Sequence, residues 1–397
     1  MFSKLLQSCL KFWAKCYLKR SKPDIVAITG SVGKTSTKDA IFEVLKVKFD
    51  GNIRKSEGNL NNETGVPLAI LGYKKSPSIF FQWLPIVITC PFKSIFSKKN
   101  KVLVLEIAAD KPGDIRYLTD FVKPKIAVLT SIGPAHLAAF GKIEKIIEEK
   151  TDLLRALSED GWAVLNIDDE KVREVLNSCQ FQVTTYGIEE PADIYARNIT
   201  TEIIDYRPIT KFQIIMGEKK LPAVTFTLGK KWNIYAALSA ASVGKILGMD
   251  LREIVAGIKQ IKPEKQRLMV YEGKKQTIII DDTYNANPVS MRAALDVLKN
   301  LPNSNNSGKK YAVLGDMLEI GNISDEAHNL IGDYAREVAD EVISVGELSK
   351  RYKANIHFDD SLKAADYLLN KIHTDDIILL KASRAIKLEK IVEVLKK

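Results

Sequence analysis

The sequence of 397 residues has little of the residue types on which disulfide, zinc and histidine chemistry depend. It contains four cysteines, none of them in a CxxC pair, and only four histidines. Scattered cysteines of this kind indicate reduced thiols in a cytosolic protein rather than a disulfide framework or a zinc site. Chemistry that depends on histidine therefore has few candidates in this chain.

The chain also lacks a long apolar run, an internal repeat and a low-complexity tract. The apolar stretch from Ile79 to Phe96 contains two prolines and is shorter than the roughly 20 residues that a membrane-spanning helix needs. It fits a packed insertion or an interfacial contact. The N-terminal segment spreads its lysines through its apolar residues and has no cleavage site of small residues, which excludes a secretory signal peptide.

Acidic residues are fewer than basic ones, and the formal net charge is +10. A basic excess favours anionic partners such as nucleotides, nucleic acid or acidic headgroups. The basic residues are dispersed and no aromatic-basic platform accompanies them, so we expect no nucleic-acid partner. With 46% hydrophobic and 27% charged residues, the composition is that of a globular protein.

Residues 1–20 form a basic amphipathic pattern at helical spacing. Its apolar side comprises Phe2, Leu5, Leu6, Cys9, Leu10, Trp13 and Tyr17, and its basic side comprises Lys4, Lys11, Lys15, Lys19 and Arg20. Such a helix packs its apolar face on its own domain or lies on an anionic membrane surface. Both interpretations stay open at the level of sequence.

Short β-branched runs alternate with helical patterns along most of the chain, which predicts an α/β fold with a mostly parallel sheet. The predicted strands are 24–29, 102–107, 126–132, 162–166, 277–281, 311–314, 341–345 and 376–381. Residues 180–228 alternate as an antiparallel edge does, and 231–260 is rich in helix. We expect an N-terminal helix (1–22), a central α/β domain (23–262) and a C-terminal Rossmann-like α/β domain (263–397).

A glycine loop follows the first predicted strand and opens a helix that runs to Phe49. In such a loop the backbone N–H groups and the helix N-terminus face a phosphate, the lysine reaches the terminal phosphates and a hydroxyl binds Mg²⁺. Ile28 stands where a full Walker A motif has its first glycine, so the loop is a shortened form. The predicted ATP-binding residues are Gly30, Ser31, Val32, Gly33, Lys34, Thr35 and Ser36.

Together with this loop, six further segments occur in the order of a known family. They are 58–68 (GNLNNETGVPL), 105–115 (LEIAADKPGDI), 132–137 (IGPAHL), 281–288 (DDTYNANP), 314–319 (LGDMLE) and 381–384 (KASR). The chain resembles the Mur ligase superfamily of ATP-dependent amide-bond ligases. Within it, the match is to the branch that adds D-alanyl-D-alanine to UDP-MurNAc-tripeptide in peptidoglycan synthesis. Fewer than 30 residues precede Gly30, so the resemblance implies a member without the usual N-terminal UDP-sugar-binding domain.

The resemblance implies roles for individual residues. Catalytic roles fall on Lys34, Glu106, His136, Lys150 and Arg267. Two Mg²⁺ ions are expected on Thr35, Glu106, His136 and Lys150, the last as a carbamate. Further ATP contacts are expected from Asn233, Arg267, Asp282, Tyr284 and Asn287, and substrate contacts from Asn61, Asn62, Asp316, Glu319, Ser383 and Arg384. Without the family, Glu106 is also consistent with a solvent-edge carboxylate, His136 with a structural loop histidine and Lys150 with a solvated lysine.

The implied activity is ATP-dependent ligation through an acyl phosphate, with UDP-MurNAc-tripeptide and D-Ala-D-Ala as partners. We expect a cytoplasmic monomer, with membrane association through residues 1–20 as an open alternative. Two other functions stay open: a related ligase for another carboxylate, lipid-linked or of the polyglutamyl or cyanophycin type, and a non-catalytic scaffold at the membrane surface.

Overall fold

The computed structural model describes residues 2–77, 79–133, 137–177, 179–189, 191–228, 230–302, 308–318 and 320–397. The chain divides into two compact units. The first comprises Met1–Arg197, Gln213–Ala223 and Ile234–Ile261, and the second comprises Asn198–Phe212, Val224–Asn233 and Lys262–Lys397. Within the described residues, no helix is long and apolar enough to cross a membrane.

A nine-stranded sheet runs in the order β2-β3-β1-β4-β5-β6-β7-β8-β9, and neighbouring strands from β2 to β7 are parallel. Its strands are β1 (Asp24–Thr29), β2 (Ile53–Lys55), β3 (Val102–Glu106), β4 (Ile126–Leu129), β5 (Trp162–Asn166), β6 (Gln182–Gly187), β7 (Ile194–Ile204), β8 (Arg207–Met216) and β9 (Lys219–Thr225). Only Asp205 and Tyr206 separate β7 from β8, and both have positive φ. Such a two-residue turn joins antiparallel neighbours, as the sequence predicts for this edge.

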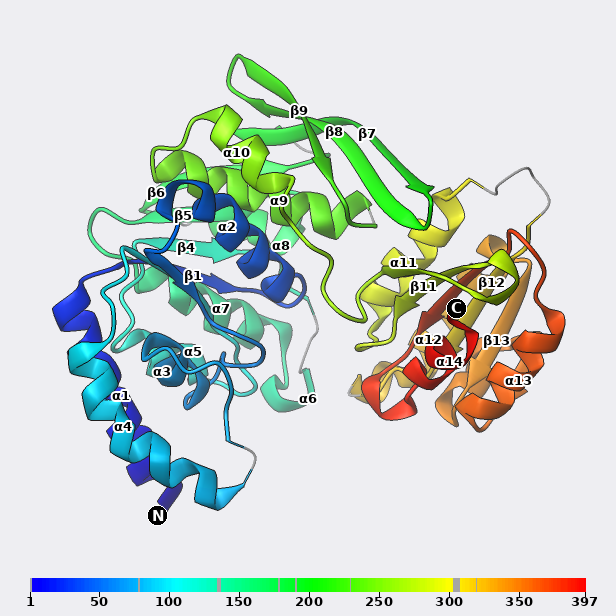
Figure 1. The fold of residues 1–397 in the computed structure, drawn as a ribbon, viewed down its shortest axis with the longest axis horizontal. Coiled ribbons are helices and arrows are strands. Elements are labelled where there is room, and N and C mark those ends of the chain that lie inside the picture. Colours follow the sequence, from blue (N-terminus) through cyan, green and yellow to red (C-terminus); the bar gives the residue numbers. More distant parts are fainter. Residues whose placement is uncertain are drawn as a thin grey trace. The chain divides into compact units, whose positions relative to one another are not determined.

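Helices cover both faces of this sheet (Figure 1). They are α1 (Phe2–Ser21), α2 (Lys34–Phe49), α3 (Gly65–Ile70), α4 (Trp83–Phe96), α5 (Asp114–Thr119), α6 (Leu137–Phe140), α7 (Ile143–Arg155), α8 (Glu170–Leu176), α9 (Lys230–Ile246) and α10 (Leu251–Ile258), with a 3-10 turn η1 at Phe80–Gln82. Ile25 and Ala27 of β1 point into a core that α1, α3, α5, α7 and α8 also fill, whereas α2 packs against α10. Successive side chains of a strand point to opposite faces of the sheet, so β1 contributes side chains to the packing on both faces.

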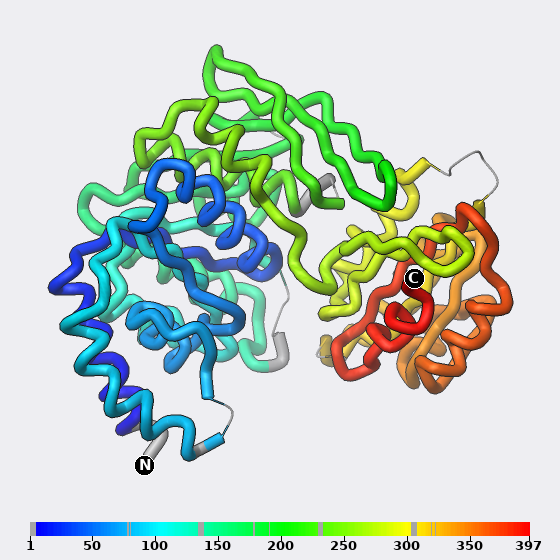
Figure 2. Tube along the Cα trace, in the orientation of Figure 1, coloured from blue at the N-terminus to red at the C-terminus, as the bar shows by residue number. Residues whose placement is uncertain are grey.

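The N-terminal helix α1 packs on its own unit. Leu6, Leu10, Ala14 and Tyr17 are buried in the core of the first unit, so this side of the predicted amphipathic pattern faces protein. Although α4 comes more than 60 residues later, α1 and α4 run side by side in the structure (Figure 2). Leu5 is an exception to the predicted apolar face, because its side chain is exposed.

The second unit contains a six-stranded sheet in the order β10-β11-β15-β12-β13-β14. Its strands are β10 (Met269–Glu272), β11 (Ile278–Asp282), β12 (Lys310–Gly315), β13 (Glu341–Val345), β14 (Ile356–Phe358) and β15 (Ile377–Lys381), of which only β10 pairs antiparallel among the described strands of this sheet. The helices are α11 (Pro288–Asn300), α12 (Ser324–Val338), α13 (Ser361–Lys371) and α14 (Glu389–Leu395), with 3-10 turns η2 (Lys274–Gln276), η4 (Gly321–Ile323), η5 (Leu348–Tyr352) and η6 (Arg384–Ile386). One apolar cluster lies under α11 and α12 and another under α13 and α14, so both faces of the sheet are covered. The predicted α/β fold class is confirmed.

Candidate active site

The loop between β1 and α2 has the backbone that a phosphate-binding loop needs. Gly30 has φ +148° and Gly33 has φ +84°, values that residues with a Cβ rarely adopt. A Cβ at position 30 would overlap with Oγ1 of Thr130. The side chain of Lys34 folds back over the loop, and its Nζ donates to the carbonyl oxygens of Gly30 (2.6 Å) and Ser31 (3.3 Å). Four predicted phosphate contacts, Ser31 to Lys34, thus lie on one tight turn at the N-terminus of α2.

Glu106 lies beside this loop, because β3 pairs with β1 and the register sets Glu106 opposite Ile28. Its side chain is only 3% exposed, so it is not a carboxylate at the solvent edge. The Nδ2 of Asn61 donates to Oε1 at 3.0 Å, whereas the buried Oε2 has no hydrogen-bond partner among the described residues. Nζ of Lys38 lies 3.9 Å from that oxygen. A buried carboxylate oxygen without a donor is suited to a hard cation such as Mg²⁺.

Lys150 is almost fully buried on α7. Burial is the main cause that lowers its pKa to about 7, and the nearby charge of Lys34 lowers it further, while Glu149 and Asp110 oppose the shift. The neutral amine of Lys150 is therefore far more accessible near pH 7 than that of an ordinary lysine. The sequence alone gives no sign of this burial, since its immediate neighbours on the helix include two glutamates.

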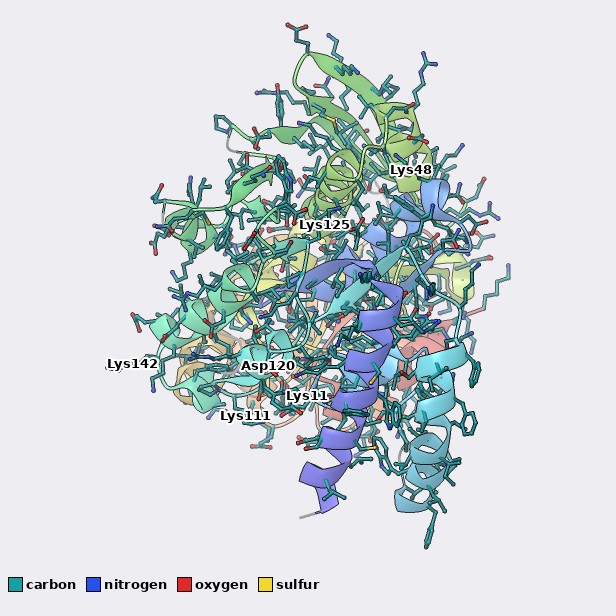
Figure 3. All side chains as sticks on the ribbon, turned by 90° about the vertical axis from the view of Figure 1, so that its left-hand side faces the viewer. Lys11, Lys48, Lys111, Asp120, Lys125 and Lys142 are labelled. Carbon is teal, nitrogen blue, oxygen red and sulfur yellow. The ribbon has the colours of Figure 1, made fainter. Side chains whose placement is uncertain are left out.

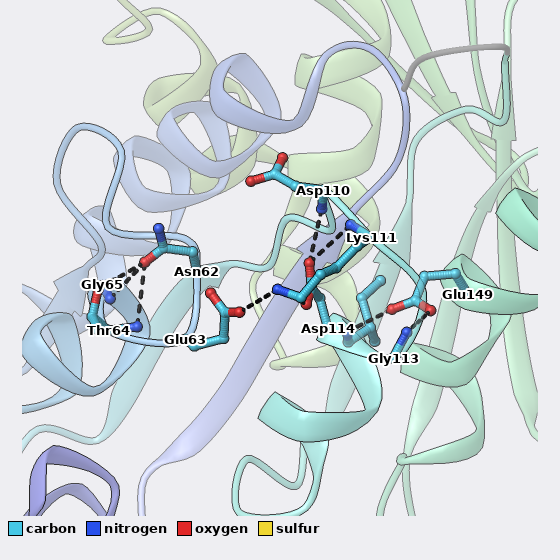
Figure 4. Close-up of polar contacts among 10 residues, drawn as sticks. Asn62, Glu63, Thr64, Gly65, Asp110, Lys111, Gly113, Asp114 and Glu149 are labelled. Carbon is cyan, nitrogen blue, oxygen red and sulfur yellow. Dashed lines mark hydrogen bonds and ion pairs between the residues drawn. The ribbon is translucent and has the colours of Figure 1, made fainter. Parts of the chain in front are cut away.

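A set of carboxylates and amides holds the loops next to these residues (Figure 4). The carboxylate of Glu149 accepts the backbone N–H groups of Gly113 (2.6 Å) and Ile115 (2.7 Å) at the start of α5. Asp114 Oδ2 accepts those of Asp110 and Lys111, each at 3.0 Å. These bonds fix the segment that follows Glu106.

Further contacts join the loop before α3 to the same region. Nζ of Lys111 lies 2.8 Å from Glu63 and 2.9 Å from Asp114. Oδ1 of Asn62 accepts the N–H groups of Thr64 (3.3 Å) and Gly65 (2.9 Å), so Asn62 ties together the turn that leads into α3. Asn61 contacts Glu106, as noted above. The substrate role predicted for Asn61 and Asn62 stays a prediction.

Two predicted site residues, His136 and Glu319, lie outside the described residues. Among the described residues, no three His, Cys, Asp or Glu side chains gather in a way that could hold a metal ion. Thr35 lies on the first turn of α2 with a half-buried side chain.

The second unit brings several predicted ATP residues together. Asp282 at the end of β11 forms an ion pair with Lys381 at the end of β15, with 2.7 Å between Oδ2 and Nζ. Burial raises the pKa of Asp282, although Lys381 opposes the shift. The guanidinium of Arg267 lies 4.5 Å from the ring centre of Tyr284, and that of Arg384 lies 5.8 Å from it. Lys381 was not predicted as a site residue; in the sequence it appears only as the first residue of the 381–384 motif.

The remaining predicted residues of this unit have structural contacts. Asn287 caps α11, because its Oδ1 accepts the N–H of Ser290 at 2.8 Å. Asn233 donates to the carbonyl oxygen of Leu228. Asp316 accepts the N–H of Ser349 at 2.8 Å.

Ser383 joins the loops that follow β12 and β15. Its hydroxyl oxygen accepts the N–H of Leu318 at 2.9 Å, and its own N–H donates to the carbonyl oxygen of Asp316 at 3.0 Å. Asp316 and Ser383, two predicted substrate contacts, therefore lie side by side.

Comparison with known proteins gives a consistent result along the chain. A family model described as the Mur ligase middle domain matches residues 28–244, and one described as the Mur ligase, glutamate ligase domain, matches residues 266–384. The UDP-N-acetylmuramoyl-tripeptide–D-alanyl-D-alanine ligase of Buchnera aphidicola (subsp. Baizongia pistaciae) is 34% identical over 378 residues, covering 93% of this chain and 74% of that protein. The protein of the same name from Bacillus subtilis is 30% identical over 399 residues, covering 97% and 79%.

Solved structures give the same result. A crystal structure of MurF from Acinetobacter baumannii superposes with a TM-score of 0.81 at 28% identity, covering 98% of this chain and 80% of that one. The MurF ligase from Thermotoga maritima in complex with ADP superposes with a TM-score of 0.82 at 28% identity, covering 98% and 83%.

Proposed function

The chain belongs to the Mur ligase family, and from that premise we propose that it is the ATP-dependent ligase that joins D-alanyl-D-alanine to UDP-MurNAc-tripeptide. Relatives of this name match nearly the whole chain. The structural observation that carries the proposal is the loop from Gly30 to Ser36 beside the buried Oε2 of Glu106. These two features supply a phosphate cradle and a cation ligand within one unit.

The reaction has two steps. A carboxylate oxygen of the tripeptide attacks the γ-phosphorus of ATP, the bond to the bridging oxygen breaks, and ADP leaves an acyl phosphate behind. The amine of D-Ala-D-Ala then attacks the carbonyl carbon, phosphate leaves, and the amine loses a proton as the amide forms. Lys34 and the N–H groups at the N-terminus of α2 stabilise charge on the transferring phosphoryl group. Arg267 is assigned the same task by resemblance to the family.

Mg²⁺ would neutralise charge at the phosphates and help to orient them. We assign its ligands to Thr35, Glu106, His136 and Lys150 as a carbamate, with two ions. The buried Oε2 of Glu106, which accepts no hydrogen bond from the described residues, supports this assignment. The role of His136 rests on the family resemblance alone.

Carbamylation of Lys150 is supported by the burial and the charge of its surroundings. The protonated amine first loses one proton; the neutral amine then attacks the carbon of CO₂ and loses a second proton, which leaves an anionic carbamate. With its pKa lowered to about 7, Lys150 offers that neutral amine at physiological pH, which an ordinary lysine does not. The resulting carboxylate-like group is a hard oxygen ligand of the kind that Mg²⁺ takes.

The test is phosphate release by the purified protein with ATP, Mg²⁺, UDP-MurNAc-tripeptide and D-Ala-D-Ala, given together or with one left out. We expect release only when both acceptor and amine are present, and the pentapeptide product by mass spectrometry. The Lys34→Met variant serves as the inactive control. ATP binding without turnover on this pair would contradict the assigned substrates, and other carboxylates would then be tried. We also propose a monomer in the cytoplasmic compartment, which gel filtration tests; cell fractionation distinguishes the free protein from a form bound to the membrane surface.

A further inference from the structure

The outward face of helix α4 is apolar over its whole length. The exposed side chains recur at helical spacing and are more than half exposed: Leu84 (64%), Ile88 (56%), Phe92 (60%), Ile95 (51%) and Phe96 (76%). Thr89 is the single polar residue among the exposed positions of α4. A surface helix ordinarily turns its polar side to water, so this face needs a partner.

The opposite side of α4 is fixed to the protein. Cys90 and Ser94 are buried, and the carbonyl oxygens of Ser94 and Ser97 accept the guanidinium N–H groups of Arg20 on α1. Figure 3 shows α1 and α4 side by side on this surface. The exposed face therefore belongs to a firmly anchored helix and not to a loose segment.

The segments that contain this helix pair are rich in basic residues, although Lys11 and Lys15 of α1 form ion pairs with Asp120. Residues 1–23 and 65–105 together contain twelve Lys and Arg and no Asp or Glu. They account for more than the whole net charge of +10, so the rest of the chain has a small acidic excess. Two lysines precede α4 and two follow it, all four exposed: Lys74, Lys75, Lys98 and Lys99.

We propose that the outward face of α4 docks the protein on an anionic lipid bilayer, with the helix in the plane of the interface. An apolar face between clusters of lysine is the pattern of interfacial helices. The 14 residues of α4 extend about 21 Å, which is too short for the roughly 30 Å of the hydrocarbon core. The helix lies on the membrane and does not span it.

The same observations disfavour a protein partner. Lysine is depleted at protein interfaces, whereas it surrounds this face. A second copy of the chain would bring two strongly basic surfaces together, which costs free energy. The sequence marks two segments as possible interfacial contacts, residues 1–20 and Ile79–Phe96. In the structure Leu6, Leu10 and Tyr17 of the first segment are buried in the core, and α4 of the second supplies the exposed apolar face.

Co-sedimentation of the full-length protein with vesicles tests the proposal. One set of vesicles contains phosphatidylcholine only, and the other adds phosphatidylglycerol. We expect binding to the anionic vesicles at least about tenfold tighter than to the neutral ones, weakening as salt is raised.

Two double variants separate the apolar from the electrostatic contribution. Ile88→Ser with Phe92→Ser should lower the affinity for anionic vesicles at least tenfold, while Leu330→Ser, at an equally exposed apolar position of α12, should leave it unchanged. Lys98→Gln with Lys99→Gln should lower it by about fivefold or more and reduce the salt dependence. The matched control for the lysines is Lys219→Gln with Lys220→Gln on β9, where both side chains are exposed.

Thermal melting and phosphate release without lipid should stay unchanged in all these variants, because none of the substituted residues belongs to the ligase site. A failure of vesicle binding would therefore leave the ligase assignment intact. Equal binding of the wild type and the Ile88→Ser, Phe92→Ser variant would overturn the proposal. The proposal would also be overturned if the wild type did not bind lipid but formed a dimer in light scattering, and the Ile88→Ser, Phe92→Ser variant were monomeric.

Discussion

Lys38 shows how a residue with no assigned role supports the candidate site. Its side chain is 2% exposed, and its Nζ lies 3.6 Å from Asp39 and 3.9 Å from Oε2 of Glu106. Removing one partner of a buried ion pair leaves the other charge without compensation. We expect Lys38→Met to lower the free energy of unfolding by about 3 kcal/mol, measured by urea denaturation.

The double variant distinguishes this electrostatic role from simple packing. Lys38→Met combined with Glu106→Gln should recover part of the loss, because neither charge is then buried alone. Lys46→Met, on the exposed side of the same helix, should change stability little. If the two substitutions add without recovery, Lys38 contributes through packing and not through the charge of Glu106.

Lys150 gives a prediction about pH and CO₂. Because its pKa is lowered to about 7, the neutral amine that reacts with CO₂ becomes scarce as the pH falls below 7. We expect ligase activity to decrease as the pH falls below 7. We also expect it to decrease in CO₂-depleted buffer and to return when bicarbonate is added. Lys150→Arg should be inactive at every bicarbonate concentration, since its guanidinium stays protonated. Isotope-labelled bicarbonate would reveal the carbamate by NMR, and an activity indifferent to CO₂ would exclude it.

At the scale of elements, α12 holds the loop after β12 through a buried histidine. Nε2 of His328 accepts the N–H of Met317 at 3.0 Å, and Nδ1 lies 2.6 Å from the carbonyl oxygen of Ser324, so Nδ1 carries the proton. Burial lowers the pKa of His328. The unfolded chain therefore binds a proton at His328 more readily than the folded chain does. The contribution of neutral His328 to the free energy of unfolding is fully present above about pH 6.5 and decreases as the pH falls below that value.

The measurement is the free energy of unfolding between pH 7 and pH 5. His328→Gln keeps an acceptor for Met317 but has no proton to gain, so we expect it to be less pH-dependent than the wild type. The difference should reach at most about 1.4 kcal/mol per pH unit below pH 6.5. His373→Gln at an exposed position is the control. Parallel slopes for all three proteins would show that His328 does not titrate in this range.

The elements also show what sequence can predict and why. The bounds of β1, β5 and β13 agree with those predicted, because buried parallel strands are continuous apolar runs with clear ends. The three-residue strands β2 and β14 were not predicted, since so short a segment has no periodicity and forms only against its neighbour. Residues 180–228, predicted from sequence as an antiparallel edge, contain the strands β6, β7, β8 and β9.

Parts of the candidate site could likewise be predicted from sequence, and other parts could not. The phosphate loop is local in sequence, so its chemistry and its place could be predicted from residues 24–49 alone. Lys38 and Glu149 could not, because their partners, Glu106 and the N–H groups of α5, come from segments distant in the chain. The burial of Lys150, which lowers the pKa of its amine, likewise follows from packing and could not be predicted from its neighbours in sequence.

At the scale of the whole molecule, nucleotide binding should stabilise the folded chain, and two variants can test its two units separately. At a concentration of MgATP one hundred times its Kd, linkage predicts about 2.7 kcal/mol of stabilisation, visible as a higher melting temperature. Lys34→Met in the first unit should abolish both this shift and turnover, while the control Lys46→Met retains both. Arg267→Ala in the second unit should lower turnover at least about a hundredfold and keep most of the shift, because its assigned role is to stabilise transferring charge. If Arg267→Ala loses the melting shift as completely as Lys34→Met, Arg267 serves binding of the nucleotide and its assignment to the chemical step is wrong.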